Sequence, residues 1–165
     1  MPDTIDGRFE LVVLHVFLLL DRLQWRAEPE QKAEDVRGPR NSGADSRDAD
    51  FAQALFDYMF ADMDHNLREM GVGDMSVGKR VRKMGEAFYG RALSYQAALD
   101  GGDAESLDEA LRRNLFGTVA EPTTEAIRMM ADYVVEARVL LRRQEAADIR
   151  AAVIRFPAPP GEASS

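Results

Sequence analysis

Large apolar side chains recur at steps of three and four residues along most of this chain, which is the spacing of amphipathic helices. Alternation of apolar and polar residues, which predicts a strand, is not sustained in any segment. No Asn-Gly or Asp-Gly turn stands between two strand-like runs. We therefore predict an all-α fold, a single-domain helical bundle of about five helices.

Five segments carry this helical pattern. The first begins between Asp6 and Phe9, ends near Arg26 and includes the apolar run Leu11–Leu20, so we expect it to be the central helix. His15 interrupts that run and is most simply a core histidine that is hydrogen-bonded to a neighbour. The other predicted helices cover about 51–70, 76–100, 106–117 and a long segment that starts at Pro122.

Capping residues indicate where several of these helices begin and end. Gly71 suits the left-handed position that follows the second helix. Ser76 is the predicted N-cap of the third helix. Ser106 and Glu109 have the spacing of a capping box, which predicts the start of the fourth.

Two segments lack the helical pattern. Residues 27–50 hold one large apolar residue, Val36, among many charged residues, prolines and glycines. Burial cannot offset the ordering entropy of such a segment, so we predict a long mobile loop. Prolines also predict a disordered tail over residues 157–165, which leaves a helical domain over residues 1–156.

Composition narrows the classes of function. The chain has 165 residues, no cysteine and a formal net charge of −8, so it needs no disulfide framework and has no thiolate metal site. An acidic chain is repelled by a phosphate backbone, which disfavours direct binding to nucleic acid. No apolar run reaches the roughly 20 residues that cross a bilayer, and the start lacks the basic region of a signal peptide. We expect the protein to stay in the compartment where it is made.

Two patterns could indicate ligand chemistry, and we interpret both as structural. Residues 73–80 have the glycine and lysine spacing of a P-loop, but Arg80 stands where a P-loop needs Ser or Thr to hold magnesium. A small nucleotide-binding protein that uses this segment is the alternative from the enzyme class. Four residues, Asp62, Asp64, His65 and Glu69, could be metal ligands, since Asp62 and Glu69 lie three and four residues from His65 on one helical face, although a solvated acidic face is the commoner arrangement. We expect no metal, no cofactor and no catalytic residue.

The segment from Gly71 to Leu93 is locally basic in this acidic chain. Cations in the first turns of a helix oppose the macrodipole, and Gly85 and Gly90 inside the helix each cost about 1 kcal/mol relative to Ala. Either another helix packs closely over the glycines, or this face forms a groove for a partner. The partner-binding residues of the second hypothesis are Lys79, Arg80, Arg82, Lys83, Gly85, Phe88, Tyr89, Gly90, Arg91 and Leu93.

Several runs in and before this segment resemble a known family, the ubiquinol–cytochrome c chaperones. The most specific is Leu-Arg-Glu-Met-Gly-Val-Gly-Asp over residues 67–74, and the others are Gly7–Glu10, Leu14–His15, Val77–Lys79, Lys83–Met84 and Ala87–Arg91. The similarity extends from about Pro2 to the last helix. Members of the family usually have additional residues before Pro2, and the loop over residues 27–50 is longer and more charged here than is usual.

The resemblance implies a non-enzymatic assembly factor of respiratory complex III that binds newly made cytochrome b. In mitochondria such factors work with a small partner subunit near the ribosome exit. A cytoplasmic location in bacteria follows, or the matrix side in organelles, with peripheral contact with the inner membrane as a further expectation. A peripheral membrane-binding protein that uses its basic helix face is the third interpretation of the sequence.

Overall fold

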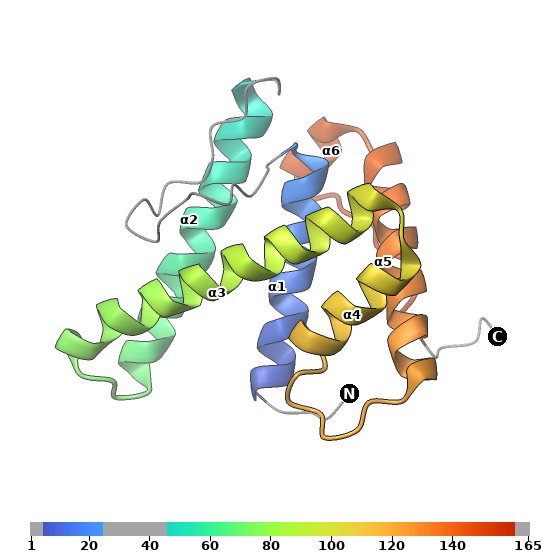
Figure 1. Ribbon diagram of the computed structural model, residues 1–165. Helices are drawn as coiled ribbons and strands as arrows, with labels where there is room; N and C mark the ends of the chain where they lie inside the picture. Colours follow the sequence, from blue (N-terminus) through green and yellow to red (C-terminus); the bar gives the residue numbers. More distant parts are fainter. Residues whose placement is uncertain (1–4, 25–45, 161–165) are drawn as a thin grey trace.

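The chain is helical in the part that the structure describes, with no strand there. The computed structural model describes residues 5–24 and 46–160. The helices are α1 (Ile5–Arg22), α2 (Ser46–Glu69), α3 (Asp74–Gly101), α4 (Ala104–Asn114), α5 (Thr124–Arg143) and α6 (Ala146–Arg150) (Figure 1). The all-α prediction is confirmed, with one short helix more than expected.

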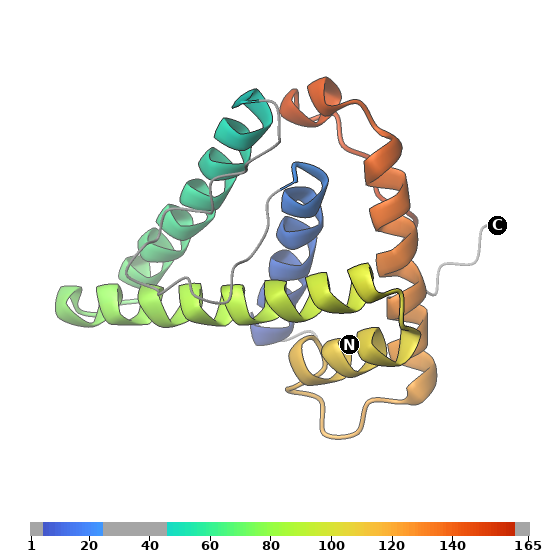
Figure 2. The same cartoon turned by 45° about the horizontal axis from the view of Figure 1, so that its top comes forward.

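The longest helix, α3, runs across the whole molecule and packs against α1, α2 and α4 (Figures 1 and 2). In Figure 2, α1 stands between α2 on one side and α5 on the other. The fifth helix packs against α1 and α4, while α6 turns back toward the first turns of α2. The central position predicted for the first helix is confirmed, since Leu14, Phe17 and Leu20 are fully buried there.

His15 is half-buried and held by its neighbours, as the sequence indicated. Its Nδ1 lies 2.7 Å from the carbonyl oxygen of Leu11, and its Nε2 lies 2.7 Å from the hydroxyl of Tyr133 on α5. Phe156 meets the imidazole edge-on, with 5.1 Å between the ring centroids. The histidine thus links α1 to α5 and to the segment after α6.

The second helix begins earlier than predicted. Residues 46–50 are helical, so the predicted loop is wrong over that stretch, and residues 27–45 lie outside the described residues. Asp48 supplies the reason: it is buried, pairs with Arg150 of α6, and places a carboxylate in the first turn, where the helix dipole favours it. The apolar pattern could not reveal this start, because it depends on a charge pair 102 residues apart.

Two of the predicted N-caps are wrong. The N-cap of α3 is Gly73, without a side-chain hydrogen bond, and the N–H of Ser76 donates to the Gly73 carbonyl at 2.7 Å. The N-cap of α4 is Asp103, whose carboxylate accepts from the backbone N–H of Ser106 at 3.0 Å. The Ser106 hydroxyl and N–H lower the pKa of Asp103. Both helices therefore begin two or three residues before the predicted cap.

Gly71 occupies the left-handed position after the second helix, as the sequence predicted. It has φ of +80° and donates its N–H to the Arg68 carbonyl at 2.9 Å, while Val72 donates to Leu67 at 3.1 Å. This pair of bonds is a Schellman motif, which needs a residue that tolerates the left-handed conformation. It turns the chain sharply from α2 into α3.

The C-terminal region follows its prediction at the start and departs from it later. Thr123 caps α5 by accepting from the N–H of Ala126 at 3.1 Å. The sequence did not predict α6, which has five residues and so too few to establish a period. Of the predicted tail, residues 157–160 form no helix and residues 161–165 lie outside the described residues.

A buried ion cluster fastens three helices together. Nε and Nη2 of Arg138 on α5 donate to the two carboxylate oxygens of Asp21 on α1, at 2.9 and 3.0 Å. Nη1 donates to the carbonyl of Leu99 on α3 at 2.8 Å, and Nη2 also pairs with Asp100. Burial lowers the pKa of Arg138, but Asp21 and Asp100 outweigh that effect and leave the pKa raised. The guanidinium is therefore charged, and its attraction to these carboxylates offsets the hydration that it loses on burial.

We expect Asp21→Ala to lower the free energy of unfolding by about 3–5 kcal/mol, because it leaves Arg138 as a buried charge without its main partner. Urea denaturation measures the change. Asp132→Ala is the matched control, since it removes an exposed carboxylate from α5. Equal stability of the two variants would show that the ion cluster does not hold the bundle together.

Candidate functional site

The apolar part of the predicted partner groove is wrong. Phe88 and Tyr89 are only 1 % and 6 % exposed, and they face α2 rather than solvent. The Phe56 ring of α2 lies 5.5 Å from Phe88 and 5.7 Å from Tyr89, between ring centroids. Because α1, α2 and α4 all pack on α3, its buried arc is wider than a single apolar stripe. Both aromatic side chains belong to the protein's own core.

The two glycines inside α3 have different surroundings. A Cβ added to Gly85 would lie 3.6 Å from the ring of Phe60, so Gly85 sits under α2, but this is an ordinary van der Waals distance that a side chain could occupy. A Cβ added to Gly90 would meet nothing within 4 Å, and Gly90 is exposed. Close packing therefore requires a glycine at neither position.

Arg91 and Leu93 also serve the fold. Nε of Arg91 donates to Glu10 of α1 at 2.6 Å, and the second pair of their fork is likewise formed, so this cation is already bound within the chain. Leu93 is half-buried and lines a hollow between α3 and α4. Because Tyr89 is buried, neither residue forms an exposed surface with it.

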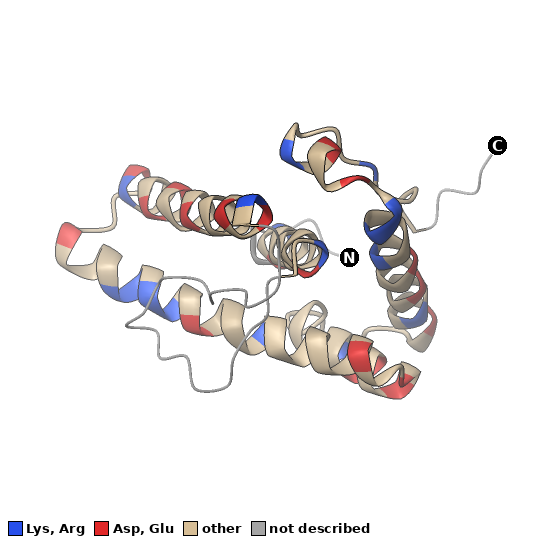
Figure 3. Cartoon of the chain, turned by 90° about the horizontal axis from the view of Figure 1, so that it is seen from above, with Lys and Arg blue, Asp and Glu red and all other residues tan. Residues whose placement is uncertain are grey.

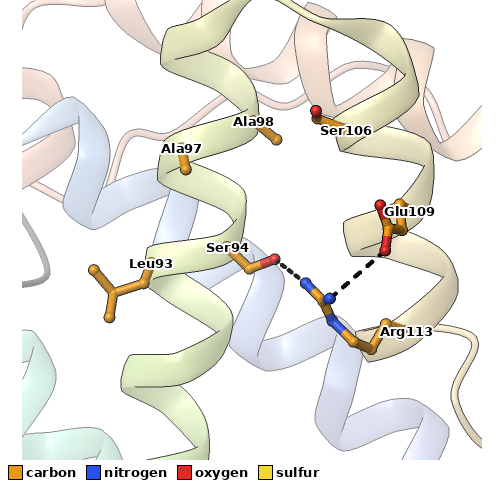
Figure 4. A pocket seen from close by; sticks show the side chains of 7 residues that line it. All are labelled: Leu93, Ser94, Ala97, Ala98, Ser106, Glu109 and Arg113. Carbon is orange, nitrogen blue, oxygen red and sulfur yellow. Dashed lines mark hydrogen bonds and ion pairs between the residues drawn. The ribbon is translucent and has the colours of Figure 1, made fainter. Parts of the chain in front are cut away.

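The hollow beside Leu93 has a volume of about 430 Å³ and is crossed by a cation (Figure 4). Nη2 of Arg113 on α4 donates to the hydroxyl of Ser94 on α3 at 2.9 Å. Nη1 of the same guanidinium lies 3.8 Å from Glu109. The charge of Arg113 is therefore neutralised by its own helix, and the remaining lining consists of small side chains.

Besides Gly90, four of the predicted site residues lie at the surface, and all four are cations. Lys79, Arg80, Arg82 and Lys83 are all exposed on the first half of α3, and we call them the α3 basic face. Within residues 5–24 and 46–160, none of the four forms an ion pair. The blue stretch of α3 in Figure 3 shows how they gather at one end of the molecule.

The P-loop alternative is incompatible with the local backbone. Residues 74–80 form the first turns of α3, so no loop is present to wrap a phosphate, and a helix rather than a strand precedes them. The N–H groups of Ser76 and Val77 both donate to the Gly73 carbonyl. A phosphate therefore has no nest of free N–H groups here.

The candidate metal residues pair with neighbours on their own helix. His65 Nε2 lies 3.3 Å from Glu69 Oε1, and Arg68 Nε donates to Asp64 at 2.6 Å. In the described part of the chain, no three acidic, histidine or cysteine side chains gather to hold a metal ion. The arrangement is that of a solvated, charged helix face.

A larger groove lies where the sequence did not place one. It has a volume of about 710 Å³ and lies between the first half of α1, the last turns of α2 and α3. We call it the methionine groove, because its lining includes four of the eight methionines: Phe9, Glu10, Val12, Met59, Asp62, Met63, Asn66, Leu67, Met70, Met84 and Thr118.

The walls of the methionine groove are mostly apolar, and the side chains at its rim are exposed to solvent. Met59 and Met63 are buried, whereas Val12 is 50 % and Met70 is 71 % exposed. Methionine side chains are flexible and polarizable, so they adapt to apolar partners of varied shape. The signal in the sequence is that Met59, Met63 and Met70 recur at helical steps in the predicted second helix, a pattern that is equally typical of a core stripe.

The comparisons with known proteins agree with the resemblance seen in the sequence. The model of the ubiquinol-cytochrome C chaperone family matches residues 1–156. The chain belongs to this family. Among solved structures it is similar to the Cbp3 homolog from Brucella abortus, with 34 % identity and a TM-score of 0.73 over 94 % of this chain and 75 % of that one. No curated protein matches the sequence.

Family membership and structure together confirm part of the expected function. The chain is a member of a family of chaperones for the ubiquinol–cytochrome c complex, and its fold is that of a Cbp3 homolog. Among the described helices, none is both long and apolar enough to cross a bilayer. None of the predicted partner-binding residues lines the methionine groove.

We expect Gly90→Ala to raise the free energy of unfolding by about 0.5–1 kcal/mol, because the exposed methyl group meets no atom and alanine favours the helix. Thermal unfolding and urea denaturation both measure this gain. A loss of stability would contradict the open surroundings that the structure gives Gly90.

Proposed function

We propose that this chain binds newly made cytochrome b during assembly of the ubiquinol–cytochrome c complex, and that the methionine groove holds an apolar segment of this client. Family membership supports the chaperone role. The observation that carries the groove assignment is an apolar hollow of about 710 Å³ that is open to solvent and lined by flexible side chains. A protein that must shield membrane-spanning segments before insertion needs such a surface.

The shape of the groove suits a helical segment of the client. Its long wall is formed by one face of α2, with Met59, Met63 and Met70 at helical steps. A helix laid along such a wall places several apolar side chains in it at steps of three and four residues. Thioether side chains re-pack around different sequences, so one groove can accept any of several apolar segments.

Polar groups at the rim limit how deeply the client is buried. Asp62, Asn66 and Thr118 line the groove beside the apolar side chains, and Glu10 is held in place by Arg91. A segment in the groove therefore keeps one face toward water or toward another part of the client. Such partial shielding favours reversible binding, which a chaperone needs in order to release its client.

Binding without chemistry is the expected mode of action. The small partner subunit and the ribosome, which the resemblance implies, stay predictions, and we assign no surface to them. Contact with a membrane is treated below, where a separate observation bears on it.

We expect the double variant Val12→Asp, Met70→Asp to lose at least about ninety per cent of its co-purification with pulse-labelled cytochrome b. An apolar segment that enters the groove would have to bury the two new carboxylates, which opposes its binding. Both side chains are exposed, so the fold and the melting temperature should be unchanged. Capture of the tagged chain from cells that synthesise cytochrome b is the measurement.

The matched control is Val135→Asp, Met129→Asp, which introduces the same charges on exposed positions of α5 outside the groove. Val135 is 48 % exposed, close to the 50 % of Val12, while Met129 is 39 % exposed against 71 % for Met70, so the control introduces its charges at positions that are no more exposed than those of the groove variant. Full capture by the groove variant, or equal loss from both pairs, would refute the assignment of the groove.

A further inference from the structure

The turn between α2 and α3 exposes two methionines to water. Met75, in the first turn of α3, is 99 % exposed, and Met70, at the end of α2, is nearly as open. The turn lies at the far end of α3 from α4, where only α2 and α3 meet (Figure 2). Among the described residues, almost nothing covers the Met75 side chain, so its apolar surface adds no burial to the fold.

The α3 basic face adjoins these methionines. Lys79, Arg82 and Lys83 follow Met75 by four, seven and eight residues, which places all four side chains on one face of the helix. Arg80 flanks this face, and Glu86 ends it. We call Met70, Met75 and the α3 basic face together the α2–α3 tip.

The acidic groups near the tip do not cancel its charge. Asp74 pairs with Arg68, which also binds Asp64, so these charges are engaged with one another. Hydrogen bonds from Arg68 lower the pKa of Asp64. Among residues 5–24 and 46–160, no carboxylate forms an ion pair with the four cations of the α3 basic face, and they give a positive patch on a chain whose net charge is −8 (Figure 3).

Local folding does not account for this arrangement. The first turn of α3 carries Asp74, whose charge the macrodipole favours, and the four cations follow in the next two turns, so the helix dipole does not account for their position. Exposed Met75 adds no burial. Cations and an exposed apolar side chain that coincide on one surface without a role in the fold point to a partner outside the chain.

We propose that the α2–α3 tip binds the surface of an anionic membrane, with the four cations at the lipid headgroups and the two methionines in the interfacial layer. Cations attract the negative surface, and exposed apolar side chains add the burial that a purely electrostatic contact lacks. The rest of the acidic chain is repelled by the same surface, so the tip alone faces the bilayer.

An RNA partner fits this surface less well. Nonspecific RNA contacts use cations together with aromatic side chains on which bases stack, and the tip offers thioethers instead. The membrane proposal does not depend on the client. It has one consequence for the groove, however: Met70 belongs to both surfaces, so the methionine groove would open beside the bilayer.

The test is co-sedimentation of the full chain with phosphatidylcholine vesicles, with and without phosphatidylglycerol. We expect binding to the anionic vesicles alone, and at least about a tenfold loss of it in Lys79→Glu, Lys83→Glu. Met75→Ser should weaken it several-fold at unchanged charge. Both variants alter exposed side chains, so circular dichroism should show the same helix content and melting temperature.

The control for charge is Arg112→Glu, Arg143→Glu, which changes two exposed cations elsewhere and gives the same net charge. It should retain most of the binding. The proposal is overturned if the chain does not bind anionic vesicles, or if the control variant loses as much vesicle binding as the tip variant. It is also overturned if single-stranded RNA displaces the vesicles from the chain and the Met75→Ser variant binds the vesicles normally. Lys79 and Lys83 do not line the methionine groove, so client capture by the Lys79→Glu, Lys83→Glu variant tests the groove independently of membrane binding.

Discussion

The packing of α3 against α1, α2 and α4 determines which surfaces this chain can offer. The three neighbouring helices cover the apolar side chains of α3, so Phe88 and Tyr89 belong to the core and are not available to a partner. In the first half of α3, Lys79, Arg80, Arg82 and Lys83 remain exposed. The methionine groove lies between the first half of α1, the last turns of α2 and α3.

The two proposed partners bind neighbouring surfaces by different kinds of interaction. The methionine groove offers apolar, adaptable contacts, whose strength comes from burial and responds weakly to salt. The α2–α3 tip offers charge and shallow insertion, whose strength falls as salt screens the cations. A chaperone for a membrane protein needs both properties, since its client is apolar and its destination is a charged bilayer surface. Met70 joins the two surfaces.

The sequence could predict what depends on local pattern. Helical periodicity, Gly71 as the residue after α2 and the family resemblance follow from adjacent residues, and all three hold. What it could not predict depends on which helices meet. A helical wheel gives the angle of Tyr89 but not that α2 covers it. Buried Met59 matches the core stripe, yet its neighbours on α1 leave a groove beside it. The start of α2 depends on Asp48 meeting Arg150, far along the chain.

The central claim is that the methionine groove holds the client, and site-specific photo-crosslinking tests it most directly. A photoreactive amino acid placed at Leu67, inside the groove, should crosslink to cytochrome b while that protein is being synthesised. The same group at Val139, on the exposed side of α5, should not. Crosslinks from Val139 and none from Leu67 would contradict the account.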